Sequence, residues 1–247
     1  MKKLAFILVL LLTFVACSKE DTNAKKVYKI GTDVTFAPFE FEKDGKYVGI
    51  DIEIMEAIAK AEGFEFELSP MNFNGIIPGL TSNQLDGAIA GMTITDERKE
   101  VLDFSEGYYE SGISAVVNAN NDKINTVEDF KGKTFAVKKG TTGSLYAEAN
   151  QKDLDAKIRY FDDSPSMFQE VVNGNADITF EDYPVIAYKL SLEENPTLKI
   201  VGEKLSSATF GFAVKKGQNQ ELLTMFNSGL KKIKESGEYD NILNKYK

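Results

Sequence analysis

The sequence lacks the side chains on which many catalytic and metal sites depend. Its 247 residues include no histidine, no tryptophan and a single cysteine, Cys17. Catalysis by a Ser-His-Asp or Cys-His arrangement and the usual zinc-ligand sets are therefore excluded. We expect neither a metal site nor a cofactor.

Positive charge is also scarce. Asp and Glu number 38 against 29 Lys and Arg, which gives a formal net charge of −9. An acidic chain of this kind argues against binding to nucleic acid or to an anionic membrane surface. The only two arginines are Arg98 and Arg159. A position that holds arginine in so lysine-rich a chain is therefore informative.

The N-terminus has the features of an export signal. A basic start, MKK, precedes the apolar run LAFILVLLLTFV, which is shorter than the roughly 20 residues that span a bilayer. Residues 1–16 are interpreted as a signal peptide. The segment FVAC resembles the bacterial lipobox, although Phe14 stands where that motif usually has Leu. Cys17 is then lipidated and 17–26 form a tether, so the protein is expected outside the cytoplasm on the cell membrane; a buried, uncleaved Cys17 is the alternative.

Strand and helix signals alternate from residue 27 to the end. This alternation predicts an α/β fold with mostly parallel sheets. The expected strands are 27–33, 64–70, 86–94, 134–138, 157–161, 176–182 and 208–214. The expected helices include one that ends at Gly63, followed by 75–82, 144–150, 164–174, 183–191 and 220–237. The stretches NQLDGAIAG and NGNADITFE resemble each other, which suggests two lobes of similar construction.

The stretch GMTITDERKE turns polar directly after the apolar run DGAIA. Thr95 followed by Asp96 and Glu97 predicts a capped helix start. Arg98 in that first turn has two interpretations. It is a solvated side chain satisfied by Asp96 or Glu97, or it faces a bound anion, for which its two-pronged guanidinium is suited.

Three further stretches are candidates for a binding site. VKKGTTGS, residues 137–144, is either a plain capped helix start or an anion site at free backbone N–H groups. Glu181 and Asp182 precede a helix, where carboxylates either complement the helix dipole or point into a cleft at an ammonium group. DVTFAPFEF and NFNG supply Asp33, Phe36 and Phe73, and such phenylalanines are more often core than ligand wall.

Together these stretches resemble a known family. GTDVTFAPFEF, GKYVGIDIEIMEAIAK, MNFNGIIPGLTSNQLD, AGMTITDERKEVLDFSEGYYESG and VKKGTTG are similar to the polar amino-acid-binding proteins of ABC importers, and glutamine-binding members are the nearest match. The resemblance implies two α/β lobes with a ligand between them. The large lobe is then 27–108 plus 211–247, the small lobe 113–205, and the hinge 109–112 and 206–210.

The resemblance also implies roles for particular residues. Arg98, Thr93 and Thr142 hold the α-carboxylate of the ligand, and Asp182, Gly91 and Thr93 hold its α-ammonium group. Phe36 and Phe73 sandwich its aliphatic part. Asp33 and Lys138, an acceptor facing a donor, select a neutral amide such as that of glutamine. Glu181 stands where the glutamine-binding pattern has histidine, and this extra acid leaves asparagine or a cationic ligand open.

The resemblance further implies a monomer that transfers no chemistry to its ligand and delivers it to an ABC permease. One alternative is a dehydratase or lyase on the same fold, with Glu181 as its acid or base. The other is a sensory domain, which would need a transmembrane helix and a signalling module beyond Lys247.

Overall fold

The structure is a computed structural model that describes residues 26–247. The predicted signal peptide, the lipidation at Cys17 and nearly all of the tether lie outside the described residues. Among the helices of residues 26–247, none has the length and apolar character needed to cross a membrane.

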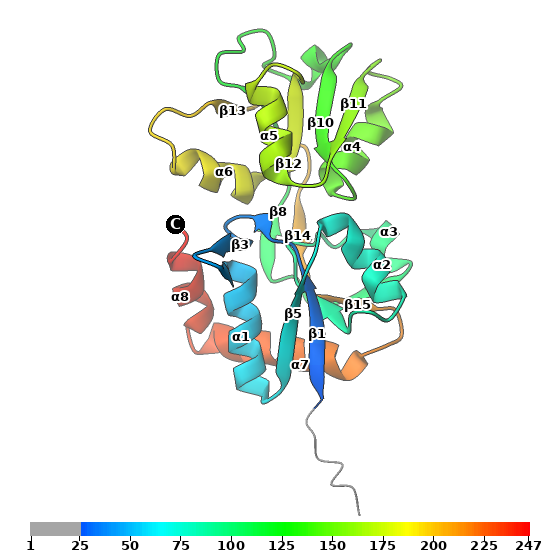
Figure 1. Cartoon of the computed structure of the whole chain (residues 1–247), viewed down its shortest axis with the longest axis vertical. Coiled ribbons are helices and arrows are strands. Elements are labelled where there is room, and N and C mark those ends of the chain that lie inside the picture. Colours follow the sequence, from blue (N-terminus) through cyan, green and yellow to red (C-terminus); the bar gives the residue numbers. More distant parts are fainter. Residues whose placement is uncertain (1–25) are drawn as a thin grey trace, which may run out of the picture.

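The chain forms two lobes, each built on a five-stranded sheet, and Figure 1 shows one lobe above the other. Lobe I, the lower one, has the strand order β5-β1-β6-β15-β7. Its sheet strands are β1 (Val27–Thr32), β5 (Glu65–Pro70), β6 (Gly87–Ala88), β7 (Leu102–Phe104) and β15 (Ala213–Lys215). Its helices are α1 (Ile50–Glu62), the 3₁₀ turn η1 (Phe73–Gly75), α2 (Ile76–Thr81), α3 (Asp96–Lys99), α7 (Gln220–Glu235) and α8 (Glu238–Asn244). A small three-stranded sheet, β2 (Thr35–Phe36), β3 (Glu40–Lys43) and β4 (Lys46–Val48), completes it.

Lobe II, the upper one, has the strand order β11-β10-β12-β9-β13. Its strands are β9 (Ile113–Asn118), β10 (Thr134–Lys138), β11 (Lys157–Phe161), β12 (Ile178–Asp182) and β13 (Leu198–Val201). Its helices are the 3₁₀ turn η2 (Val127–Phe130), α4 (Thr142–Asn150), α5 (Ser164–Val172) and α6 (Tyr183–Ser191).

The α/β class is confirmed, but the prediction of mostly parallel sheets is wrong. In lobe I, β1 pairs in parallel with β5 and β6, whereas β15 is antiparallel to β6 and β7. In lobe II, β10 pairs in parallel with β11 and β12, whereas β9 is antiparallel to β12 and β13. The antiparallel strands are those that directly follow a crossing between the lobes. In each lobe, the strand that enters from the other lobe runs against the two strands beside it.

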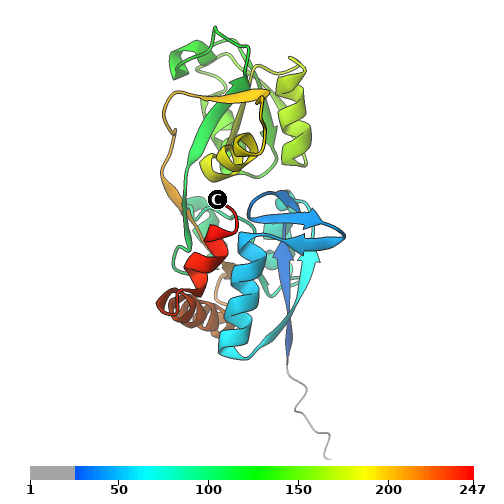
Figure 2. The same ribbon diagram turned by 90° about the vertical axis from the view of Figure 1, so that its left-hand side faces the viewer.

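Two strands make the crossings. β8 (Tyr109–Ser111) and β14 (Ala208–Phe210) pair antiparallel with each other and form a separate two-stranded sheet between the lobes. Figure 2 shows both connections along one side of the molecule. The expected strand 208–214 is therefore two strands, β14 and β15, in different sheets.

The predicted end of one helix is confirmed, and the predicted length of one strand is wrong. Helix α1 ends as predicted at Gly63, whose φ of 75° and N–H bond to the Ala59 carbonyl make a left-handed cap. The expected strand 86–94 is limited to β6, because the chain leaves the sheet after Ala88 and turns at Gly91, with a φ of 51°. That turn carries the first part of the site.

An aromatic cluster fixes the crossing strands to lobe I. Phe39 lies edge-on to Phe210 of β14 at 5.0 Å between ring centroids, and edge-on to Tyr109 of β8 at 4.8 Å. Deeper in the same core, Phe212 stacks on Phe226 of α7 at 4.5 Å. Packing of these rings ties helix α7 to the sheet and anchors both crossings at one end.

Candidate functional site

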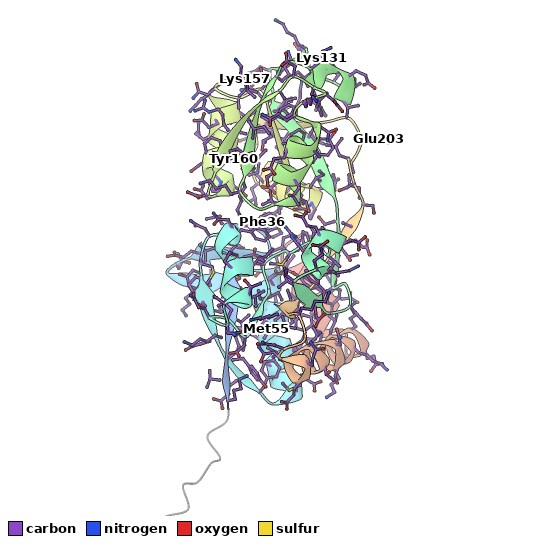
Figure 3. The ribbon with its side chains drawn as sticks, turned by 90° about the vertical axis from the view of Figure 1, so that its right-hand side faces the viewer. Phe36, Met55, Lys131, Lys157, Tyr160 and Glu203 are labelled. Atoms are coloured by element: carbon purple, nitrogen blue, oxygen red, sulfur yellow. The ribbon has the colours of Figure 1, made fainter. Side chains whose placement is uncertain are left out.

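Side chains from both lobes meet around one small cavity. Lobe I contributes Phe36, Phe73, Gly91, Thr93 and Arg98, and lobe II contributes Lys138, Thr141, Thr142 and Asp182; together they line a cavity of about 10 Å³. Figure 3 shows Phe36 at the level where the lobes meet. The strand ends explain the convergence, because β10 and β12 end at Lys138 and Asp182, and the carboxyl ends of parallel strands share one edge of a sheet.

Eight of the nine residues predicted for ligand contact line this cavity, and the ninth, Asp33, touches one of them. Thr141 lines it as well and was not predicted. Its hydroxyl caps α4 by accepting a hydrogen bond from the Ser144 N–H at 3.2 Å. Larger hollows, such as one of about 390 Å³ between β2 and the helices α5 and α6, lack this concentration of buried charge.

Arg98 is a buried cation at the lobe boundary. Its side chain is on the short helix α3, which Thr95 caps as predicted by accepting from the Arg98 N–H at 3.2 Å. Arg98 is only 4 % exposed, and it forms no ion pair with any carboxylate of residues 26–247. The interpretation as a solvated side chain satisfied by its neighbours is therefore wrong.

Neutral groups hold the Arg98 guanidinium in place. Nη1 donates to the Thr93 carbonyl at 2.7 Å, and Nη2 donates to the Gly140 carbonyl of lobe II at 3.0 Å. The Phe73 ring lies 5.3 Å from the guanidinium carbon. Burial lowers the pKa of Arg98 to about 10, while Asp182 and Glu97 act in the opposite direction. A cation so desolvated and without a paired anion is poised to bind one.

Asp182 is the buried anion that lobe II brings to the cavity. It is the residue before α6, but its side chain makes no capping hydrogen bond to that helix, so it does not act as a helix cap. Its Oδ1 instead accepts a hydrogen bond of 2.7 Å from the hydroxyl of Ser111 in β8. Burial raises the pKa of Asp182 to about 6, and the Ser111 bond and Arg98 partly counteract this. Ser111 was not predicted from the sequence.

Asp33 and Lys138 form a salt bridge across the lobe boundary. Asp33 follows β1 in lobe I, Lys138 ends β10 in lobe II, and each side chain is 2 % exposed. The second carboxylate oxygen of Asp33 accepts from the Val34 N–H at 2.7 Å. The two residues were predicted to face each other, and the structure brings them into direct contact.

The Gly91 turn requires a glycine. A Cβ at Gly91 would lie 2.4 Å from Cε1 of Phe36, and the φ of 51° is one that other residues rarely adopt. The Gly91 N–H donates to the Asp51 carboxylate at 2.7 Å, which points this turn toward the cavity wall. Close packing of the Phe36 ring against the turn therefore depends on the absence of a side chain at residue 91.

The family follows from comparison with known proteins. The model of the bacterial extracellular solute-binding proteins, family 3, matches residues 28–247. The chain belongs to this family. The two-lobe α/β fold matches solved structures of amino-acid-binding proteins.

Relatives of this family 3 protein differ in what they bind. The L-cystine-binding protein TcyJ of Escherichia coli K12 is 34% identical over 219 residues, which cover 88% of this chain and 81% of TcyJ. An ancestral arginine-binding protein bound to arginine is 42% identical with a TM-score of 0.84, covering 89% of this chain and 97% of that one. An ancestral arginine-binding protein bound to glutamine is also 42% identical over the same shares, with a TM-score of 0.82.

Glu181 is a further buried acid of this family 3 chain beside the cavity. It is 3 % exposed; its Oε1 accepts from the Asp182 N–H at 3.0 Å, and its Oε2 has no hydrogen-bond partner among the described residues. Burial raises the pKa of Glu181 to about 7; Asp182 raises it further and Lys138 lowers it. An acid in this state can hold a proton or accept a donor from a ligand.

Proposed function

We propose that this protein binds one polar L-amino acid between its lobes and delivers it to the permease of an ABC importer. The proposal rests on two buried, opposite charges that line the same cavity: the cation of Arg98 from lobe I and the anion of Asp182 from lobe II. Neither charge is in an ion pair within residues 26–247. The α-carboxylate and α-ammonium groups of a free amino acid are the matching pair of charges. Binding would give each buried charge the partner that it lacks.

Each of the other lining residues has a role in this proposal. Arg98, with Thr93 and Thr142, binds the α-carboxylate, and the N-terminus of α4 adds backbone N–H groups there. Asp182 and the Gly91 carbonyl bind the α-ammonium group. Phe36 and Phe73 enclose the aliphatic carbons between them.

For the ligand side chain, glutamine is the first candidate. A side-chain amide inserted between Asp33 and Lys138 would donate its NH₂ to the carboxylate and accept from the ammonium group, so both charges keep a partner. A basic amino acid is the second candidate, because Glu181 has a buried carboxylate oxygen without a partner. The arginine and glutamine complexes of similar ancestral proteins support both candidates.

Binding is proposed to close the lobes. The hinge would be residues 109–112 and 206–210, which contain β8 and β14, between a large lobe of 27–108 plus 211–247 and a small lobe of 113–205. A ligand held by Arg98 and Asp182 contacts both lobes only when they are closed. It would therefore shift the population toward the closed state.

The family description as extracellular supports a place outside the cytoplasm. We propose a signal peptide at residues 1–16, a lipid on Cys17, a tether of 17–26 and a monomeric binding protein held at the cell membrane.

A catalytic function has one observation in its favour. The pKa of Glu181, about 7, suits a general acid or base. A similar protein is also relevant here: an ancestral amino acid-binding protein described as a precursor of cyclohexadienyl dehydratase is 39% identical, with a TM-score of 0.79. The match covers 89% of this chain and 95% of that one.

Calorimetry of residues 18–247 against each of the twenty amino acids tests the proposal. We expect one glutamine bound per chain. If binding heat is measured only with arginine or lysine, the ligand is a basic amino acid and the glutamine proposal is wrong. If no amino acid gives binding heat, the proposed function is refuted. Arg98→Ala should remove detectable binding without unfolding the protein, because a buried charge partner is worth about 2–5 kcal/mol.

The other arginine of the chain supplies the matched control. Arg159 is on β11 at the surface, with its side chain 47% exposed and paired with Glu170 at 2.9 Å. Arg159→Ala should therefore bind as the unmodified protein does. Full binding by Arg98→Ala would refute the role of Arg98.

A further inference from the structure

Two carboxyl groups are completely buried behind the Gly91 turn. Glu40 in β3 and Asp51 in the first turn of α1 are both 0 % exposed. Within residues 26–247, both oxygens of Glu40 and the Oδ1 of Asp51 have no N–H or O–H donor. Two ionised carboxylates in such a place would each be desolvated and would repel each other.

The other oxygen of Asp51 joins two parts of the molecule. Asp51 Oδ2 accepts from the Gly91 N–H at 2.7 Å and from the Tyr108 hydroxyl at 2.7 Å. Gly91 belongs to the turn that lines the cavity, and Tyr108 directly precedes the crossing strand β8. The Tyr108 N–H also donates to the Phe210 carbonyl of β14 at 2.9 Å. One carboxylate oxygen therefore links the binding turn to both crossing strands.

A single proton would join one oxygen of Glu40 to the Oδ1 of Asp51, and so satisfy two of the three oxygens that lack a donor within residues 26–247. If Glu40 is protonated, its O–H can donate to the carboxylate of Asp51, which after burial acts most strongly on the pKa of Glu40. Burial raises the pKa of Glu40 well above its usual value, and Asp51 and Asp33 raise it further, while Lys138 lowers it. Burial raises the pKa of Asp51 only to about 6, because hydrogen bonds from Gly91, Tyr108 and Glu40 favour its charged form.

The remaining groups around the pair agree with this assignment. Burial raises the pKa of Tyr108 well above its usual value, so its hydroxyl stays a donor to Asp51. Tyr239 donates to the Tyr108 carbonyl, and burial raises its own pKa to about 12. Asp33 and Lys138, whose charges also act on Glu40, are paired with each other. Within residues 26–247, neither Glu40 nor Asp51 forms an ion pair with a lysine or arginine.

We propose that Glu40 and Asp51 share one proton and act as a positioning pair, which holds the Gly91 turn in its ligand-binding shape and fixes it to Tyr108 at the crossing. The pair does not touch the ligand. Its effect on affinity rests on the proposed amino-acid site, in which the Gly91 carbonyl binds the ammonium group. Loss of the Glu40 proton donor would leave Asp51 Oδ1 unpaired and loosen its hold on Gly91.

Variants at Glu40 separate this role from a merely structural one. Glu40→Gln keeps a donor toward Asp51, because the side-chain amide replaces the carboxylic O–H, and should bind the amino acid within about threefold of the unmodified chain. Glu40→Leu keeps the volume and removes the donor, and should weaken binding about tenfold or more, since an unmet buried acceptor costs about 1–3 kcal/mol. Glu42→Leu, at an exposed position of the same strand, is the matched control and should bind normally.

The proton itself can be observed by infrared spectroscopy of the full chain. At about pH 8, where an ordinary carboxyl group is ionised, the unmodified chain should still show the C=O stretch of a protonated carboxylic acid. Glu40→Gln should lack that band, and Glu42→Gln should keep it. An identical spectrum for Glu40→Gln and the unmodified chain would overturn the shared proton.

Affinity and stability together decide whether the pair positions the site. If Glu40→Leu unfolds at a lower temperature but, while folded, binds as tightly as the unmodified chain, the pair is merely structural and the proposal is overturned. If Glu40→Leu does not fold, Tyr108→Phe, which removes one donor to Asp51, should weaken binding about threefold, and unchanged affinity would overturn the proposal. An unmodified chain that binds no amino acid would refute the proposed function, whereas the infrared band would still test the proton.

Discussion

The two ends of the proposed site hold their opposite charges in different ways. At one end, Arg98 bonds to two neutral carbonyl groups and Asp182 to a hydroxyl, so neither charge is paired. At the other end, Asp33 and Lys138 are already paired with each other across the lobes. The first end needs the two charges of an amino acid. The second must open its own ion pair before it can hold a side chain.

This difference separates the recognition of amino acids in general from the choice of one particular amino acid. In the proposed site, the Arg98–Asp182 end would match groups that every amino acid carries, because neither charge is in an ion pair among residues 26–247. The Asp33–Lys138 end favours only a side chain that can replace both halves of an ion pair. We therefore expect changes at the first end to reduce binding of all ligands, and changes at the second to alter the choice among them.

The largest expected effect is at the first end. Asp182→Asn should weaken binding of every amino acid ligand about a hundredfold or more, because the ammonium group loses its buried counter-charge, a loss of about 3 kcal/mol. Calorimetry measures this. Asp162→Asn, at an exposed carboxylate paired with Lys139, is the control. If Asp182→Asn weakened the binding of glutamine but not of other amino acids, Asp182 would not act on the ammonium group that all amino acids share.

Glu181 adds a pH-dependent contribution between the two ends. Its pKa in the folded chain, about 7, lies above that of an unfolded glutamate, about 4.3. The folded state therefore binds more protons between these values, so this contribution to stability is present below about pH 4 and is lost as the pH rises to about 7.

Removal of that titration should be visible in the free energy of unfolding. Between about pH 5 and pH 8, Glu181→Gln should lose less stability than the unmodified chain, by up to about 2–3 kcal/mol. Denaturant unfolding at the two pH values measures the difference. Asp51, which does not act on Glu181, titrates in both proteins and cancels in the comparison. Equal pH slopes for the two proteins would show that Glu181 stays ionised.

A smaller effect is expected at the second end. Lys138→Met leaves Asp33 as a buried carboxylate without its cation, so the affinity for arginine or lysine relative to glutamine should rise about tenfold. Competition binding measures the ratio. Lys139→Met, at the neighbouring exposed lysine, should leave the ratio unchanged. A parallel loss for all ligands would show that the Asp33–Lys138 pair holds the lobes together and does not select the side chain.

The smallest effect is expected at the residue that orients Asp182. Ser111→Ala removes the 2.7 Å hydrogen bond to Asp182 and should weaken binding about threefold to tenfold. Ser207→Ala, at an exposed position of the other crossing segment, is the control. Titration of glutamine into the three proteins would compare them directly, and unchanged affinity in Ser111→Ala would mean that Asp182 is held by other contacts.

Local sequence patterns predicted much of the fold. The Thr95 cap of α3 and the left-handed end of α1 at Gly63 follow from short-range preferences of residues next to one another in the chain. The antiparallel direction of β9 and β15 was not predicted, because strand direction depends on how the chain returns between the lobes. The break in 208–214 was missed for the same reason, since nothing in ATFGFAV marks a change of sheet.

Part of the site could be predicted from the sequence and part depends on tertiary contacts. Asp182 was a candidate because it lies at the end of an expected strand, where ligands bind in α/β sheets, whereas Lys138 was assigned to the site only through the family resemblance. Ser111 carried no signal beyond its polarity, and Thr141 was not singled out within the candidate stretch VKKGTTGS. Glu40 was missed because FEFEKDG has the alternation of a surface hairpin, in which a glutamate is expected to face solvent. Its burial comes from packing of β3 against α1.

The position of β15 also has a consequence for the order of folding. This strand lies between β6 and β7, yet it follows all of lobe II in the chain, and α7, which covers the same core, comes later still. During synthesis, β6 and β7 would have no strand between them until residues 213–215 emerge. Lobe II, contiguous in sequence from β9 to β13, is then the part that can complete its sheet first. Lobe I would stay incomplete, with its apolar surface open to chaperones, until β15 and α7 have been made.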